Sequence, residues 1–229
     1  MAGRRRTGFR PRRGAARALW LAAALAAGAW GATGCGERRS AARPAEPPLF
    51  ESLTPATTGV TFENRLPESP DFNILNYLYY YNGGGVAVGD VNGDSLPDLY
   101  FSSNLEPNRL YLNKGNFTFE DVTERAGVGG PPGWKTGVTM ADVDGDGDLD
   151  LYVSAVRYLA MQGRNVLYIN DGTGRFTDRT AAFGVGHEGY ATQALFFDYD
   201  LDGDLDLYQL NHSTHTERAV GSPALRTVP

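Results

Sequence analysis

Three acidic loops set between apolar runs constrain the fold of this chain more than any other feature. They run from Asp90 to Asp98, from Asp142 to Asp150 and from Asp198 to Asp206, so their starts lie 52 and 56 residues apart. Each loop follows a short apolar run and leads into a second one that contains Leu-Tyr. This pattern is typical of two β-strands joined by a loop. Recurrence at such a period indicates a repeat protein.

A second element recurs between the acidic loops. Residues 108–128 return as residues 165–185, and both copies contain Asn-x-Leu-Tyr-x-Asn followed by Phe-x-Asp-x-Thr. Short Gly-containing turns, Lys-Gly-Asn at 114–116 and Asp-Gly-Thr-Gly at 171–174, separate the two halves of each copy, as in β-hairpins. Because no amphipathic helical period is present, we predict an all-β fold, a partial β-propeller of four-stranded antiparallel blades.

The first 34 residues are predicted to be a signal peptide, which would form a helix. They contain seven arginines and no acidic residue, followed by an apolar stretch at 18–33. This is the layout of a secretory signal, and the stretch is shorter than the roughly 20 residues of a membrane-spanning helix. The chain is therefore predicted to be exported, with the membrane reached only through the signal or a lipid.

Cys35 is the single cysteine and directly follows the predicted signal. Its context, Ala-Thr-Gly-Cys, resembles the lipobox of bacterial lipoproteins, although Ala32 stands where that motif usually has Leu. We therefore predict that Cys35 is lipidated and that residues 35–49 form a flexible tether. The predicted location is the bacterial outer membrane or cell surface. The alternative is ordinary cleavage near residues 27–29.

The repeat region is predicted to span residues 50–229. It would hold a closing strand at 50–60, one blade at 82–128, a second at 134–185 and a partial blade at 190–229. Residues 50–60 resemble the last part of a unit, yet nothing before them resembles the earlier strands. The prediction is an orphan closing strand, two full units and half of a third.

Each acidic loop is a candidate calcium site, because oxygen-bearing side chains recur at its positions 1, 3, 5 and 9. Alternate residues of a curling loop point inward, and hard oxygen ligands in this number suit calcium. Two carboxylates about 4 Å apart repel by roughly 4 kcal/mol even at an effective dielectric near 20, so such a group needs a cation. The predicted ligands of about three Ca²⁺ sites are Asp90, Asn92, Asp94 and Asp98; Asp142, Asp144, Asp146 and Asp150; and Asp198, Asp200, Asp202 and Asp206.

Other families with this ligand spacing fit less well. An EF-hand places a bidentate Glu at position 12, where this chain has Phe101, Val153 and Gln209. Thrombospondin-type calcium repeats use disulfides, which one cysteine cannot form. A solvated acidic turn could explain one loop, but three copies with equal spacing argue against it. Because Asn92 lowers the charge of the first loop, that loop is predicted to bind calcium most weakly.

The acidic loop between strands, with Asn-x-Leu-Tyr-x-Asn and Phe-x-Asp-x-Thr, resembles the FG-GAP or VCBS repeats of integrin-α-type propellers. Among these the chain is most similar to bacterial lipoproteins related to cartilage acidic protein, which carry a C-terminal ASPIC/UnbV domain. The resemblance covers residues 50 to about 213 and implies a seven-bladed calcium-binding propeller with the ligands named above. The chain is too short for seven blades and lacks that C-terminal domain, which predicts an N-terminal fragment or a truncated gene product.

The predicted function is a calcium-binding repeat module of a cell-surface lipoprotein that binds a protein or glycan partner. Without the signal, 14 basic residues face 27 acidic ones, so nucleic acid is not an expected partner. Tyrosines at 77–81 beside three glycines could bind sugar, but strand packing is favoured. His187, His212 and His215 lack a nucleophile or paired partner at a recognisable spacing, so no catalytic residue is predicted. The alternatives are a scaffold for a polysaccharide-active enzyme and a non-functional fragment.

Overall fold

The computed structural model describes residues 48–70, 72–158 and 161–213. The predicted signal peptide, Cys35, most of the tether and the last 16 residues of the partial blade lie outside the described residues. The chain divides after Glu51, and the architecture below belongs to its second part.

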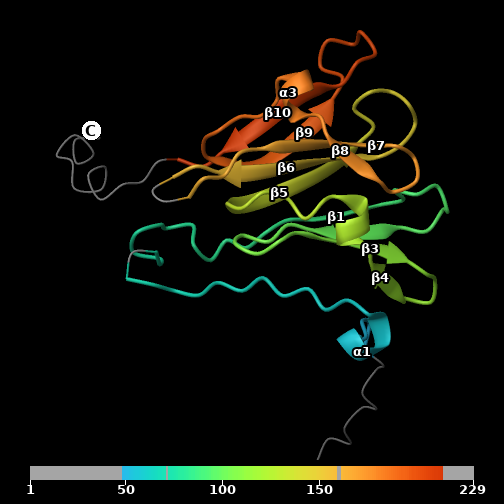
Figure 1. The fold of residues 1–229 in the computed structure, drawn as a ribbon, viewed down its shortest axis with the longest axis horizontal. Helices are drawn as coiled ribbons and strands as arrows, with labels where there is room; N and C mark the ends of the chain where they lie inside the picture. The colour runs from blue at the N-terminus through green and yellow to red at the C-terminus, as the bar shows by residue number, and fades with distance from the viewer. Residues whose placement is uncertain (1–47, 71, 159–160, 214–229) are drawn as a thin grey trace, which may run out of the picture. The chain divides into compact units, whose positions relative to one another are not determined.

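The described chain is mostly β-structure in three antiparallel sheets (Figure 1). The sheets have the strand orders β1-β2-β3-β4, β5-β6-β7-β8 and β10-β9, which confirms the predicted antiparallel four-stranded arrangement for the first two. The strands are β1 Val86–Gly89, β2 Asp98–Phe101, β3 Arg109–Asn113, β4 Phe119–Asp121, β5 Trp134–Ala141, β6 Asp150–Val156, β7 Val166–Asn170, β8 Phe176–Asp178, β9 Ala191–Phe197 and β10 Asp206–Asn211.

Each acidic loop connects the first two strands of a sheet in the same register. The residue before loop position 1 pairs with the aspartate at position 9: Gly89 with Asp98, Ala141 with Asp150 and Phe197 with Asp206. Position 9 is therefore the first residue of the second strand as well as the last residue of the loop. The identical register explains why the loop spacing is the same in all three repeats.

The first strands of the three sheets, β1, β5 and β9, pack against one another in that order. Two glycines at equivalent repeat positions permit the close approach. A β-carbon on Gly85 would lie 2.7 Å from the backbone nitrogen of Val138, and one on Gly137 would lie 2.5 Å from the carbonyl oxygen of Thr192. Any larger residue would separate the neighbouring sheets.

The core lies between successive sheets. Apolar side chains of the first and second sheets form one cluster, and Tyr152 and Leu167 meet Ala194 of the third sheet in another. A third cluster surrounds Trp134, which is 1 % exposed and lies edge-on to Phe72 and Tyr77. Aromatic pairs of this kind each contribute about 0.5–1.5 kcal/mol beyond the burial of their area.

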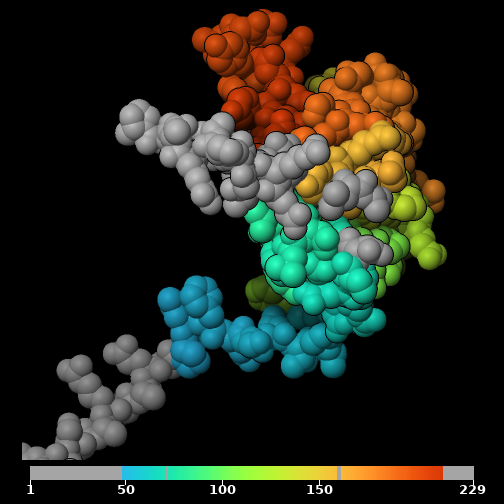
Figure 2. All heavy atoms as spheres, turned by 90° about the vertical axis from the view of Figure 1, so that its left-hand side faces the viewer, coloured from blue at the N-terminus to red at the C-terminus, as the bar shows by residue number. Residues whose placement is uncertain are grey.

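The tyrosines at 77–81 do not lie in a strand, which corrects the prediction for that segment. They occupy consecutive turns between residues 73 and 82, held by backbone bonds such as that from the Tyr80 amide to the Tyr77 carbonyl. Tyr77 and Tyr80 are nonetheless buried, as the packing interpretation requires. Turns bring their rings onto Trp134, whereas a strand would point alternate rings away from it. The segment that directly precedes β1, coloured teal, is on the face seen in Figure 2.

Short helices follow the last strand of each full sheet, although the sequence prediction excluded helices there. They are α2 Thr123–Ala126 and α3 Thr180–Phe183. The side chain of Asp121 accepts hydrogen bonds from the amide and hydroxyl of Thr123, and Asp178 does the same with Thr180. These local bonds compete with strand pairing, so Phe-x-Asp-x-Thr ends a strand and begins one helical turn.

The prediction of a β-strand at residues 50–60 is wrong. No residue between 50 and 60 is in a strand, and one helical turn, α1 Pro55–Thr58, lies there instead. It ends at Gly59 with φ 79°, as α2 ends at Gly127 with φ 76°. The sequence resemblance to the end of a unit therefore reflects the helical turn. That this segment closes a complete propeller stays a prediction.

Every helix in the described residues is a single four-residue turn, and none has the length or apolar character of a membrane-spanning segment.

Candidate metal centres

The three acidic loops share one backbone conformation. Positions 4 and 6 adopt positive φ in every loop: Gly93 and Ser95, Gly145 and Gly147, Leu201 and Gly203. This conformation favours glycine, because a β-carbon there approaches the following carbonyl oxygen. Ser95 and Leu201 nevertheless adopt it, with φ of 65° and 63°. The loop geometry is thus set by more than the local preference of these two residues.

The aspartate at position 1 organises the curl of each loop. In the second loop, Asp142 Oδ1 accepts bonds of 2.8 and 3.0 Å from the amides of Gly145 and Asp146, and Oδ2 accepts one of 3.0 Å from Gly147. Asp198 accepts the equivalent amide of Gly203 in the third loop. Position 1 therefore gathers the backbone around its own carboxylate.

In the first loop, the amides gathered around Asp90 affect the pKa of its carboxyl group. Burial alone would raise the pKa of Asp90, but bonds from four backbone amides together lower it below the ordinary value. The amides belong to Ser95, Asn92, Gly93 and Asp94. Hydrogen bonds to a carboxylate favour its charged form. The carboxylate that organises this loop is thus held ionised, which is the form that binds a cation.

The aspartate at position 9 ties the loop to the third strand of its sheet. Asp150 is 1 % exposed; its Oδ2 accepts the Val143 amide at 2.8 Å and its Oδ1 accepts the Asn170 amide at 2.9 Å. Asp98 makes the same two bonds with Val91 and Asn113. The sequence prediction gave position 9 only the role of a ligand and missed this structural one.

The pKa of each buried position-9 carboxyl lies above its ordinary value. For Asp150 the main cause is burial, which the two backbone bonds partly oppose and the charges of Asp144 and Asp146 reinforce. Asp98 behaves likewise, with Asp94 and Asp90 as the neighbouring charges. A cation among these carboxylates would reverse the repulsive contribution.

The loops bring carboxylates together at two places in the described residues. Ligand oxygens of Asp142, Asp144 and Asp146 all lie within 4.8 Å of one another. Those of Asp198, Asp200 and Asp206 do the same. Oxygen-only groups of this kind fit calcium or another hard cation, whereas zinc and copper prefer nitrogen and sulfur.

The hydrogen bonds of Asp198 and Asn92 bear on whether a cation fits the third and the first loop. Asp198 Oδ1 is buried and has no hydrogen-bond partner among the described residues, so it is an acceptor that a cation would satisfy. In the first loop, Asn92 Oδ1 accepts the Asp94 amide at 3.1 Å, while Asn92 Nδ2 donates to Asp94 Oδ2, also at 3.1 Å. The described residues fit a metal in the second and third loops, and the individual ligand roles remain predictions.

Sequence reasoning also missed a buried network that explains the repeated Asn and Tyr. In the first sheet, Tyr100 donates its hydroxyl to the Val128 carbonyl and accepts from Asn108 Nδ2, each at 2.8 Å. In the second sheet, Tyr152 donates to Val185 at 2.8 Å and accepts from Asn165 at 2.9 Å. The recurrence of Asn and Tyr at matching positions of the two repeats is visible in the sequence, but their spacing does not reveal that their side chains are hydrogen-bonded to each other.

One bond links an acidic loop to the neighbouring sheet. Asn170 Nδ2, at the end of β7, donates to the carbonyl oxygen of Val91 in the first loop at 2.8 Å. Both groups are buried. The first loop is therefore part of the contact between the first and second sheets. Anything that fixes the conformation of this loop would also stabilise that contact.

Comparison with known proteins gives results consistent with this geometry. The sequence matches the FG-GAP-like repeat family over residues 90–153 and 157–208, which is more than half of the chain. Cartilage acidic protein 1 of Mus musculus is 31 % identical over 132 residues, which cover 56 % of this chain and 20 % of that protein. The Homo sapiens protein is 30 % identical over 132 residues, covering 56 % and 19 %. This chain spans about a fifth of the length of these relatives. With its repeated strand, acidic loop and strand, the chain belongs to the FG-GAP-like repeat family.

Proposed function

We propose that this chain is a calcium-binding β-propeller module of an exported cell-surface lipoprotein, and that it binds a protein or glycan partner without catalysing a reaction. The main support for metal binding is that the second and third loops each bring three carboxylates together. The buried Asp198 Oδ1, which lacks a hydrogen bond among the described residues, adds to it.

The residues that would hold the ions are those at positions 1, 3, 5 and 9 of each loop. A bound calcium ion would supply positive charge that offsets the mutual repulsion of the carboxylates. The chain's own groups hold the loop: position 1 gathers the loop amides and buried Asp150 holds the third strand. These roles are structural, and they support a stabilising function for the metal.

The proposed partner binding and location rest on sequence features. The predicted signal and the Cys35 motif support export and lipid attachment. The similarity to cartilage acidic protein 1 covers only a fifth of that protein, so any role of the whole relative is an expectation for this chain. The support for a non-enzymatic role is that the carboxylates at positions 1 and 9 of the loops accept backbone amides, which is a structural use.

Calcium titration of the chain after exhaustive chelation tests the metal sites. Calorimetry should detect about three calcium sites, and a ligand that binds only the folded state should raise the melting temperature. Asp146→Ala should remove one site and leave the other two. Asp148→Ala is the matched control, because it removes the same charge two residues away in the same loop. Absence of both calcium heat and a melting shift would overturn the proposed metal binding.

A further inference from the structure

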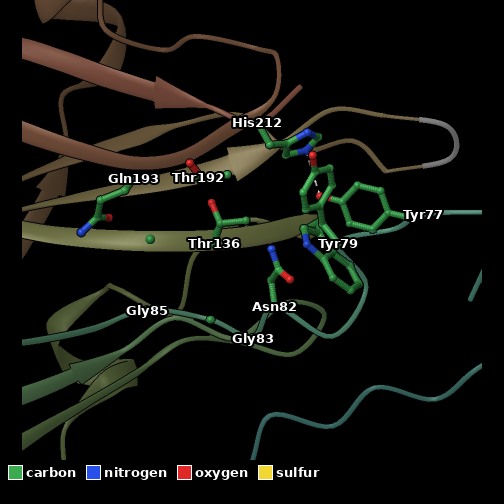
Figure 3. Close-up of a pocket in the computed structure, with 12 residues that line it drawn as sticks. Tyr77, Tyr79, Asn82, Gly83, Gly85, Thr136, Thr192, Gln193 and His212 are labelled. Carbon is green, nitrogen blue, oxygen red and sulfur yellow. Dashed lines mark hydrogen bonds between the residues drawn. The ribbon is translucent and has the colours of Figure 1, made fainter. Parts of the chain in front are cut away.

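A pocket opens between the segment that precedes β1 and the first strands of the second and third sheets. It encloses about 300 Å³, at the lower end of the size range of small-molecule sites. Figure 3 shows Tyr77, Tyr79 and His212 on one side, Gln193 and Thr192 on the other, and Thr136 between them. The pocket lies apart from the acidic loops, and no residue of those loops lines it.

The aromatic side of the pocket is held rigidly by contacts between distant parts of the chain. The hydroxyl of Tyr77 lies 3.0 Å from His212 Nε2, and the rings of Tyr79 and His212 have centroids 4.2 Å apart. The hydroxyl of Tyr79 lies 3.0 Å from Ser213 Oγ. Tyr79 remains partly exposed, so part of its ring is available to a ligand. An aromatic ring offers a flat apolar surface of this kind at little entropic cost.

The rest of the lining offers neutral hydrogen-bonding groups: Asn82 beside Tyr79, and the threonines and Gln193 farther across the pocket (Figure 3). Asn82 and Gln193 are exposed, and the side chain of Asn82 makes no hydrogen bond within the described residues. Thr136 and Thr192 donate their hydroxyls to main-chain carbonyls, which leaves oxygen lone pairs free to accept. The pocket lining contains no Asp, Glu, Lys or Arg, in a chain with a net charge of −6.

We infer that this pocket binds a single neutral sugar ring. A pyranose has an apolar face that stacks on an aromatic ring and an edge of hydroxyls that pairs with amides and hydroxyls, which matches the two sides of the pocket. Both ring nitrogens of His212 are engaged, Nε2 with the Tyr77 hydroxyl and Nδ1 with the Ser213 carbonyl, and the rest of the lining offers no ionic partner to a charged ligand, which would lose hydration without compensation. The inference rests on the proposed function, since it names the ligand class of the proposed binding module.

The test uses ligand-observed NMR with the full chain in calcium and four probes: D-glucose, D-galactose, D-mannose and D-glucuronate. At least one hexose should bind with a Kd on the order of 1 mM, the affinity expected for about a dozen non-hydrogen atoms. D-glucuronate has the same ring with a carboxylate and should bind at least about tenfold more weakly than D-glucose if glucose is the ligand. Asn82→Ala and Gln193→Ala should each weaken binding about fivefold or more.

Asn76→Ala is the matched control, because Asn76 is also exposed but does not line the pocket. It should leave hexose binding unchanged, and all variants should keep the parent melting temperature. The inference is overturned if no hexose binds, if glucuronate binds as well as glucose, or if the two pocket variants bind like the parent. Binding of the uncharged peptide acetyl-(Ala-Gly)4-amide in place of the hexoses would also overturn it.

The same samples separate this inference from the proposed function. Calcium-dependent melting without hexose binding would remove the sugar site and leave the metal module. Hexose binding without any calcium effect would remove the metal sites and leave the pocket.

Discussion

The second and third repeats contain nearly the same acidic loop in different surroundings. Asp150 is buried and its two oxygens accept amides from the loop and from β7. The equivalent Asp206 accepts the amide of Tyr199 but is exposed, and no described strand pairs with the outer edge of β10. Tyr152 and Tyr208 differ in the same way, at 1 % and 60 % exposure. The comparison shows that neighbouring strands decide whether a repeat position is a structural anchor or a surface group.

The largest expected effect concerns the edge of the third sheet. Exposed strand edges recruit other strands, so we expect residues 36–229 in calcium to elute from size-exclusion chromatography as an oligomer or aggregate. Leu210→Lys on β10 should shift the elution toward the monomer. Leu75→Lys, also at an exposed leucine but outside the sheets, should not. A well-dispersed monomer of the parent would contradict this prediction.

Truncating the position-9 aspartate should lower the free energy of unfolding more in the second repeat than in the third. Asp150→Ala leaves two amides without an acceptor, that of Asn170 buried and that of Val143 half-buried, so we expect a loss of about 3 kcal/mol in the free energy of unfolding. Asp206→Ala should cost less than about 1 kcal/mol, because its group is exposed. Urea unfolding in EDTA measures the difference without any contribution from metal. Equal losses for the two variants would mean that the β7 contact does not matter.

A smaller difference is expected for the repeated tyrosines. Tyr152→Phe removes the bond to the Val185 carbonyl and one of the two acceptors of Asn165 Nδ2, the other being Gln209 Oε1, so it should cost about 1.5 kcal/mol. Tyr208→Phe should stay within about 0.5 kcal/mol. Thermal unfolding followed by circular dichroism can measure both. A comparable cost at Tyr208 would show that its hydroxyl has a partner that the described residues do not reveal.

The smallest effect concerns position 4 of the third loop. Leu201 has φ 63° and is 85 % exposed, whereas the second loop has Gly145 there. Leu201→Gly should relieve the left-handed strain of about 1 kcal/mol but increase the flexibility of the unfolded chain, for a net gain of about 0.5 kcal/mol. Gly145→Leu should destabilise the second loop by a similar or larger amount. Chemical denaturation in EDTA measures both variants, and a destabilised Leu201→Gly would contradict the strain argument.

Much of the fold was predictable because it depends on local patterns. The alternation of apolar runs and turns predicted the strands, and the period predicted two complete four-stranded sheets. The helical turns were missed because four residues are too few to produce an amphipathic period, and the bonds of Asp121 to Thr123 that end β4 depend on side-chain geometry. The turns at 77–81 were missed because burial on Trp134 is a long-range contact.

For the candidate site, the sequence by itself determined which residues carry oxygen ligands and that each loop curls, since those properties depend on residue type and spacing along a few residues. Only the tertiary structure decided which carboxylates become buried anchors. Asp150 and Asp206 have the same local sequence, but only Asp150 lies beside a third strand that supplies a second amide and removes it from water. Solvation and hydrogen bonding depend on segments distant in the chain, so the role of each repeated aspartate follows from packing rather than from its position in the repeat.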